Sequence, residues 1–308
     1  MTCDLMTKLK LIILLFFVAS GFYSVGFISA ALEVFPYTFV KTNYQKIKYK
    51  YNYIDHTTLK SCTVAEITEL PDQFSTVIGH AYGAHKHATS ERFLAPKVYS
   101  FLLEHSKNID AVIFTGDVFS TPGATKWRRL VDEFSEMQIF VAPGNHDVLN
   151  PDFKKIFFKE IFDLNNPNDR VFPFFMNTQN FDILIDNSIE NRWSIDREVV
   201  EKVDKFMSDT VIARHDPPIR ELIQFSNGVY SPEEKLLPNV ENFVKDFKSR
   251  RKFTWIIGDG GAWEFLPRLV CKEHRNHKFI VNGIGEVKHD VILILHEGEI
   301  YQYLIGGN

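Results

Sequence analysis

Residues 138–147 read QIFVAPGNHD: an apolar run ends in proline and glycine, and Asn145, His146 and Asp147 follow. Residues 109–117, IDAVIFTGD, have the same plan. A short apolar or β-branched run that is bounded by Gly or Pro predicts a buried β-strand. Glycine at the end of a strand lets the backbone turn and lets it approach a bound ligand closely. Both stretches therefore predict a strand that delivers polar side chains at its carboxyl end.

The chain from residue 71 onward alternates strands and helices, which predicts an α/β layered fold. The expected strands are residues 74–79, 110–115, 138–142, 181–186, 210–214, 253–257, 278–281, 290–295 and 299–305. The expected helices are residues 91–105, 125–136, 194–207 and 239–248. The turn Glu297-Gly298 joins the last two strands into a hairpin, so a mixed sheet is favoured over a purely parallel one.

Five of these strands end in residues that can bind a ligand. The residues are His80 after Gly79, Asp117 after Gly116, Asn145-His146-Asp147 after Gly144, His215, and Asp259 after Gly258. In open α/β sheets, ligands bind outside the carboxyl ends of the strands. Carboxylate, amide and imidazole donors suit Mn, Fe, Zn or Mg. One such residue is usually a turn residue, but five in order predict a metal site.

The order of these motifs resembles that of the calcineurin-like metallophosphoesterases. Gly116-Asp117, the tetrad at residues 144–147 and His215 followed by Pro217-Pro218 carry the resemblance. It implies an αββα sandwich of two mixed sheets flanked by helices. It also implies a dinuclear metal site that hydrolyses phosphomonoesters or phosphodiesters.

The first and last motifs depart from the family pattern. His80 stands where the family has Asp, and Tyr82 stands where it has His. Asp259 replaces the first His of the last motif, and Gly261 removes the second. One Asp of the family pattern is His here and one His is Asp, so the summed charge of the ligands is similar to that in the family. This balance favours a remodelled working site over a decayed one.

The resemblance assigns the ligands by position. One ion would keep Asp117, Asn145 and His215, with Asp259 completing its site. The other would keep Asp117 and His80, so the site holds one or two divalent ions.

Four further residues have expected roles. By the same resemblance, His146 would protonate the leaving alkoxide or stabilise its charge, and Asp147 would hydrogen-bond to His146. His85 and His87 follow closely in GAHKH. They either substitute for missing ligands or belong to a solvated loop, which is the favoured interpretation.

Three functions compete. The first is a membrane-anchored metal-dependent hydrolase that cleaves a phosphate ester at an atypical metal site. The second is an inactive protein of the same fold that binds a phosphorylated ligand or partner. The third is a one-metal hydrolase that acts on a different bond. The substrate would be phosphorylated but is not identified by the sequence.

Composition sets further limits. The 308 residues carry a net charge of −4, and nothing in this charge suggests a nucleic-acid partner. The only cysteines are Cys3, Cys62 and Cys271, too few for a Cys-rich zinc knuckle. A Cys62–Cys271 disulfide is an alternative if the domain is exported, but free buried thiols are the favoured expectation.

The N-terminus contains a candidate membrane segment. Residues 1–10 form a short basic segment. Residues 11–32 form an uncharged segment that is long enough to span a bilayer. We expect a transmembrane signal anchor, with a cleaved signal peptide as the alternative. Residues 33–70 are an expected linker, and residues 71–308 are the phosphoesterase domain. Lysines flank the segment on both sides, so they do not decide its orientation in the membrane. The exported side is slightly favoured as the location of the protein.

Overall fold

The computed structural model describes residues 21, 23–24, 26–27, 37–51, 58–162, 172–190, 194–195, 197–204, 209–226, 236–247, 251–263 and 265–306. Residues 1–53 and 54–308 form two compact units. Apart from residues 21, 23–24 and 26–27, the expected membrane segment at residues 11–32 lies outside the described residues. Among the helices of the described residues, none combines the length and apolarity needed to cross a bilayer.

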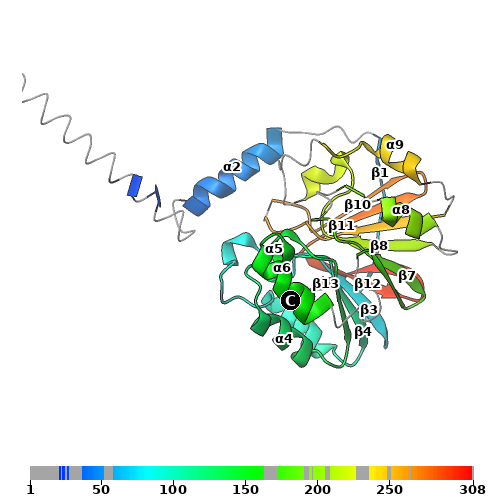
Figure 1. Ribbon diagram of the computed structural model, residues 1–308, viewed down its shortest axis with the longest axis horizontal. Helices are drawn as coiled ribbons and strands as arrows, with labels where there is room; N and C mark the ends of the chain where they lie inside the picture. The colour runs from blue at the N-terminus through cyan, green and yellow to red at the C-terminus, as the bar shows by residue number, and fades with distance from the viewer. Residues whose placement is uncertain are drawn as a thin grey trace, which may run out of the picture. The chain divides into compact units, whose positions relative to one another are not determined.

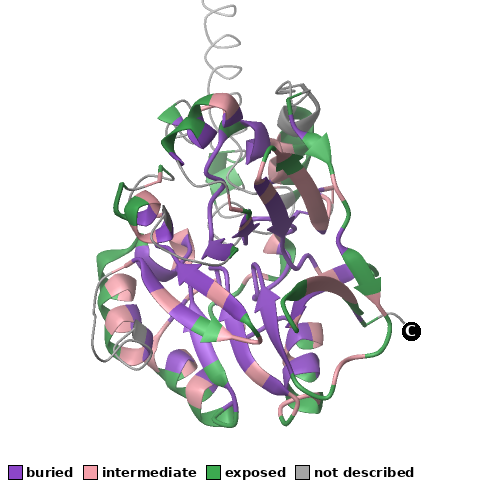
Figure 2. Ribbon diagram, turned by 90° about the vertical axis from the view of Figure 1, so that its right-hand side faces the viewer, coloured by how far each residue is buried: buried purple, intermediate pink, exposed green. Residues whose placement is uncertain are grey.

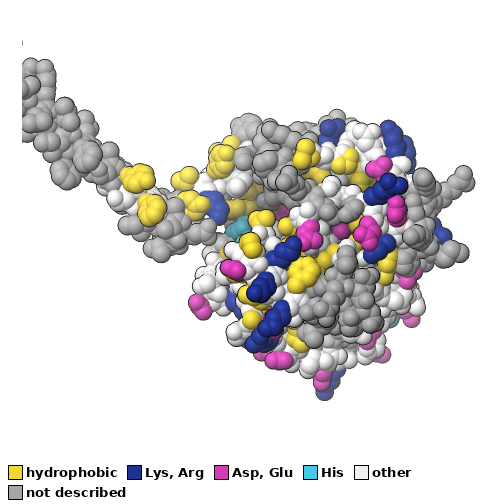
Figure 3. All heavy atoms as spheres, viewed as in Figure 1, with side chains coloured by type: hydrophobic (Ala, Val, Ile, Leu, Met, Phe, Trp, Pro, Cys, Tyr) yellow, Lys and Arg dark blue, Asp and Glu magenta, His cyan; other side chains and the backbone are white. Residues whose placement is uncertain are grey.

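The N-terminal unit contains helix α2, Tyr37–Tyr51, within the segment that was expected to be a linker (Figure 1). Tyrosines and isoleucine alternate with lysines here, which resembles a strand over a few residues, but the 15-residue segment is helical. The side chains of Phe39, Val40, Tyr44 and Ile47 are exposed, and hydrophobic side chains are visible along this unit in Figure 3.

The second unit contains two mixed sheets. The first has six strands, in the order β2 (Ala65–Ile67), β13 (Glu299–Ile305), β12 (Asp290–His296), β3 (Phe74–Ile78), β4 (Ile109–Phe114) and β5 (Gln138–Val141). Strands β3, β4 and β5 are parallel, whereas β12 runs antiparallel to both β3 and β13. The expected hairpin at Glu297-Gly298 is present, with φ of +48° and +81° at its two turn residues.

The second sheet has seven strands. Their order is β1 (Lys60–Ser61), β10 (Leu269–His274), β11 (His277–Asn282), β9 (Phe253–Ile257), β8 (Thr210–Arg214), β7 (Phe181–Ile185) and β6 (Phe174–Thr178). The four central strands, β11, β9, β8 and β7, are parallel, and antiparallel strands flank them. Strands β6 and β10 were not expected from the sequence.

Helices lie against both sheets (Figure 1). The α-helices of this unit are α3 (Pro96–Glu104), α4 (Ala124–Glu133), α5 (Asn145–Val148), α6 (Pro151–Phe157), α8 (Arg197–Asp204) and α9 (Val240–Phe243). The short 3-10 helices are η1 (His85–His87), η3 (Arg220–Phe225) and η5 (Val244–Asp246), and Phe158–Phe162 (η2) forms a π-helical turn. The expected two mixed sheets flanked by helices are confirmed.

The two faces of the seven-stranded sheet pack against different layers of the domain, and successive side chains along a strand alternate between them. Ile183 and Ile185 of β7 join the core that contains the six-stranded sheet, whereas Leu184 between them joins the core that contains α8 and α9. Successive side chains of a strand point to opposite faces, so one face packs on the other sheet and the other face packs on helices. The buried strands at the centre of Figure 2 show the resulting interior.

The domain begins before Pro71, because strands from the expected linker belong to both sheets. Strand β1 pairs with β10, placing Lys60 opposite Glu273 and Ser61 opposite Lys272. Continuing this register by one residue brings Cys62 opposite Cys271, and the two form a disulfide with a Cα–Cα distance of 5.0 Å. The favoured expectation of free thiols is therefore wrong. Neither β1 nor β10 is indicated by a pattern in the sequence, and without this pair of strands the two cysteines had no reason to meet.

We expect the Cys62–Cys271 disulfide to stabilise the domain strongly, because it links residues 209 positions apart. Reducing it, or replacing both cysteines by serine, should lower the free energy of unfolding by about 2–5 kcal/mol, since the unfolded chain gains freedom. Urea denaturation followed by fluorescence measures this. Cys3→Ser, which leaves the bond intact, is the control. An unchanged midpoint after reduction would show that the bond does not constrain the chain.

His277 at the start of β11 lies in an aromatic cluster. Its ring is 5.0 Å from Phe247 and 4.9 Å from Phe253, between ring centres, and its side chain is 1% exposed. Trp255 Nε1 donates a hydrogen bond of 3.1 Å to His277 Nδ1. Burial, together with the nearby charges of His274 and Arg275, lowers the pKa of His277 to about 3. The cluster therefore holds a neutral imidazole.

This burial predicts a pH-dependent loss of stability. The pKa of His277 is lower in the folded chain than the ordinary value of 6.5, so its stabilising contribution is complete above 6.5 and is lost as pH falls toward 3. Between about pH 7.5 and pH 5 the loss should be about 2 kcal/mol. His277→Gln keeps an acceptor for Trp255, and its unfolding free energy should fall less over the same interval. Parallel pH profiles for both proteins would contradict this.

Candidate metal centre

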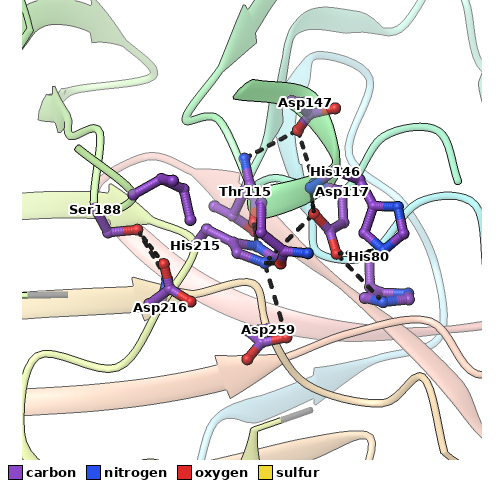
Figure 4. A network of polar contacts seen from close by, with 12 residues as sticks. His80, Thr115, Asp117, His146, Asp147, Ser188, His215, Asp216 and Asp259 are labelled. Atoms are coloured by element: carbon purple, nitrogen blue, oxygen red, sulfur yellow. Dashed lines mark hydrogen bonds and ion pairs between the residues drawn. The ribbon is translucent and has the colours of Figure 1, made fainter. Parts of the chain in front are cut away.

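The carboxyl ends of strands from both sheets meet at one place (Figure 4). Strands β3, β4 and β5 lead to His80, Asp117 and Asn145, and strands β8 and β9 lead to His215 and Asp259. The backbones approach so closely that a Cβ at Gly258 would lie 1.8 Å from the carbonyl oxygen of Thr115. All the residues that the sequence singled out as ligands therefore come from different strands to one buried site.

Asp117 lies at the centre of this site, and each of its oxygens faces a different imidazole. Its Oδ1 is 3.5 Å from His215 Nε2, and its Oδ2 is 3.6 Å from His80 Nε2. The backbone has φ of +53° here, and the backbone N–H of His146 donates to Oδ1 over 3.0 Å. A Cβ at Gly144 would lie 2.3 Å from Oδ1, so only glycine fits beside the carboxylate.

Three histidines around Asp117 are anchored in the same way. The Nδ1 atoms of His80, His146 and His215 lie 3.0, 2.7 and 2.9 Å from the backbone oxygens of Gly83, Ser120 and Thr115. A carbonyl oxygen can only accept, so Nδ1 carries the hydrogen and Nε2 of the neutral ring presents a lone pair. Metal-binding histidines usually have this orientation.

The lone pairs point at a carboxylate, and this arrangement requires a positive charge. Nε2 of His80, His146 and His215 lies between 3.5 and 4.0 Å from the nearest Asp117 oxygen. Two acceptors that face each other repel unless a proton or a cation lies between them. The donor set fits a divalent metal because imidazole, amide and carboxylate donors suit such ions.

Further oxygens converge on His215. Its Nε2 is 3.3 Å from Asn145 Oδ1 and 3.7 Å from Asp259 Oδ1. Ligand atoms of His215, Asp216 and Asp259 lie within 4.8 Å of one another, and no other group of three His, Cys, Asp or Glu residues in the described part of the chain meets this spacing. Sequence reasoning missed Asp216, although it directly follows His215. Its carboxylate also accepts from Ser188 Oγ over 2.8 Å.

The charges at the site shift the pKa values of His215 and Asp117 in opposite directions. Burial opposes protonation of His215, but Asp117, Asp216 and Asp259 outweigh it and raise its pKa to about 10. Burial opposes ionisation of Asp117, but His215, His146 and His80 outweigh it and lower its pKa to about 2. The protein therefore favours a positive charge at His215 beside a negative one at Asp117.

Asp147 has a different partner from the expected one. Its Oδ2 accepts from the backbone N–H groups of Gly144 and Asp117, both at 2.9 Å, whereas His146 Nδ1 bonds to Ser120. Burial and the charge of Asp117 raise the pKa of Asp147 to about 7. Asp147 therefore holds the two turns together, which positions Asp117 rather than His146.

The positions that depart from the family pattern are also ordered. Tyr82 is buried, and its ring centre is 4.3 Å from that of His80 and 5.3 Å from that of His146. Gly261 has φ of +80°, and a Cβ there would lie 2.2 Å from the carbonyl oxygen of Gly283. No side chain fits at Gly261 without a backbone shift. His85 lies beside Tyr82, whereas His87 is exposed.

Comparisons with known proteins identify the family of this chain. Residues 91–281 match the profile of a family described as calcineurin-like phosphoesterase. A solved purple acid phosphatase from yellow lupin (Lupinus luteus) seeds is 10% identical, with a TM-score of 0.47, over 75% of this chain and 53% of that one. The chain thus spans about half of the length of that protein. The search of curated proteins gave no match. Because the family profile covers more than half of the sequence, the chain belongs to the calcineurin-like phosphoesterase family.

Proposed function

We propose that this protein hydrolyses a phosphate ester with the help of one or two divalent metal ions. The observation that carries the proposal is the placement of Asp117, whose two oxygens face the Nε2 atoms of His215 and His80. A carboxylate with a different imidazole at each oxygen has the arrangement of a ligand shared by two ions. Membership of a divalent-metal-dependent phosphoesterase family supports the same assignment.

The residues divide into two groups around Asp117. Asn145, His215 and Asp259 would hold an ion at Oδ1, and His80 would hold an ion at Oδ2. A divalent ion at this place supplies Lewis acidity and a nucleophilic water at neutral pH. The donor types are compatible with Mn, Fe, Zn or Mg.

His146 is placed to handle the proton of the leaving group. Its side chain is 29% exposed, whereas those of His80 and His215 are buried. Its Nδ1–H is fixed by the backbone oxygen of Ser120, so Nε2 faces the site. In the protonated imidazolium, Nε2 would give its proton to the leaving oxygen and the ring would return to the neutral form. Asp147 would act indirectly, because its bonds to the backbone N–H groups of Gly144 and Asp117 position Asp117.

A second function is favoured by one specific observation. The family places an imidazole where this chain has Gly261, and the position is closed by the backbone of Gly283. A protein that has lost this ligand could keep the fold and bind a phosphorylated ligand or partner without turnover. A hydrolase that uses one ion is the intermediate case.

We also propose that the domain is held at a membrane by residues 11–32 and faces the exported side. The length and apolarity of this run support the anchor. The Cys62–Cys271 disulfide supports the exported side, because disulfides persist in oxidising compartments.

The test is turnover with and without metal. Protein purified without chelator should contain divalent metal by elemental analysis and should hydrolyse p-nitrophenyl phosphate or bis-p-nitrophenyl phosphate. Dialysis against chelator should remove the activity, and adding back Mn²⁺ or Zn²⁺ should restore it. Metal-loaded protein that turns over neither these esters nor a broader panel of mono- and diesters would support the binding function instead.

A further inference from the structure

The loop between β3 and α3 is fixed to the rest of the domain on both sides of His85. Arg92 Nε donates to the backbone oxygen of Tyr82 over 2.7 Å, and Arg92 Nη2 is 2.5 Å from Glu286 Oε1. The second oxygen of Glu286 accepts from the backbone N–H of Ala84 over 3.1 Å. These side chains are largely buried, so both ends of the loop are packed against the domain, whereas Lys86 and His87 between them are exposed.

His85 lies next to the position that lacks a ligand. Its backbone N–H donates to the oxygen of Ala262 over 3.3 Å, which places it beside Gly261. Its ring centre is 4.7 Å from that of Trp263, and the ring is half-buried. His85 thus brings an imidazole from the loop close to the position at which the family's last motif would provide one.

His85 is also close enough to His80 for both to bind one ion. Their ring centres are 5.8 Å apart. With a metal–nitrogen bond of about 2.0–2.1 Å, the ring centres of two histidines on one tetrahedral ion are about 5 Å apart. The hydroxyl of Tyr82 is 3.5 Å from His85 Nδ1, so a polar partner is present on the same side.

We propose that His85 replaces the imidazole lost at Gly261 and completes a second metal position with His80 and Asp117 Oδ2. This inference rests on the proposed function, because it assumes the first ion at His215. His215, Asp216 and Asp259 already have ligand atoms within 4.8 Å of one another, a spacing that no group containing His80 and His85 meets among the described residues. The second ion should therefore bind more weakly than the first.

The experiment measures metal binding by the full chain, not activity. Chelator-stripped protein is titrated with Zn²⁺ or Mn²⁺ by equilibrium dialysis and elemental analysis. The wild-type chain should bind two ions with different affinities. His85→Phe keeps a ring against Trp263 and Tyr82 but removes the nitrogen donors. This variant should keep the tight ion, and its affinity for the weaker ion should fall by about 100-fold or more. Loss of an outer-shell partner alone lowers metal affinity by about 10–100-fold, and a direct ligand should matter at least as much.

His87→Ala is the matched control, because His87 is two residues away in the same 3-10 helix and is exposed. It should bind two ions like the wild type. Circular dichroism checks that each variant is folded, and His85→Ala serves if the phenylalanine variant is not.

Each other outcome overturns the inference. Two ions with wild-type affinities in the His85 variants would exclude His85 as a ligand. A single ion in the wild type that is lost in His215→Ala would overturn the second position but leave the proposed function intact. No ion in the wild type would overturn both.

Discussion

Asp117→Asn should lower metal affinity and turnover together. The substitution keeps an oxygen that can accept the backbone N–H of His146, so the turn should survive. It removes the negative charge that faces His80 and His215. Metal affinity should fall by about 100-fold or more. Turnover should fall by about 10³-fold or more, since a metal contributes several kcal/mol and each 1.36 kcal/mol is a factor of ten.

Calorimetric titration with Mn²⁺ and the rate of ester hydrolysis measure the two effects of Asp117→Asn. Asp132→Asn makes the same chemical change on the exposed surface of α4 and should leave both unchanged. A folded Asp117→Asn protein that keeps its metal would remove Asp117 from the ligand set.

His146→Ala should separate turnover from metal binding. The backbone N–H of His146 bonds to Asp117 Oδ1, and any side chain leaves that bond in place. His146 Nε2 is 4.0 Å from Asp117 Oδ2, farther than the nitrogens of His80 and His215 are from the carboxylate. We therefore expect wild-type metal content and a rate lower by about 10²–10⁴-fold, the usual contribution of a general acid or base.

The leaving group identifies the role of His146. An alkyl phosphate ester has a basic leaving oxygen that needs a proton, whereas p-nitrophenolate leaves without one. The loss of rate in His146→Ala should therefore be larger for the alkyl ester. Equal losses for both esters would mean that His146 positions the substrate and does not transfer the proton.

The candidate ligands that directly follow a strand could be predicted from the sequence. Apolar runs ending in glycine locate His80, Asp117, Asn145, His215 and Asp259, because the end of a strand fixes where the next residue lies. The fold followed from the same runs, since alternating strands and helices admit few layer arrangements.

The features that depend on long-range pairing could not be predicted. Cys62 and Cys271 meet only because β1 pairs with β10, and two-residue β1 has no periodic signal. One of the two partners of Asp147 is a backbone N–H 30 positions away, which no local pattern encodes. His85 reads as a solvated loop residue, and only the contacts of Arg92 with Tyr82 and Glu286 show that the loop is packed.

Anomalous diffraction from crystals grown with Mn²⁺ tests the central claim most directly. We expect a peak about 2.0–2.3 Å from both Asp117 Oδ1 and His215 Nε2, within reach of Asn145 and Asp259. The two acceptors would then face an ion rather than each other. Crystals in which Mn²⁺ binds elsewhere, and in which His215 bonds directly to Asp117 through a proton, would contradict the account.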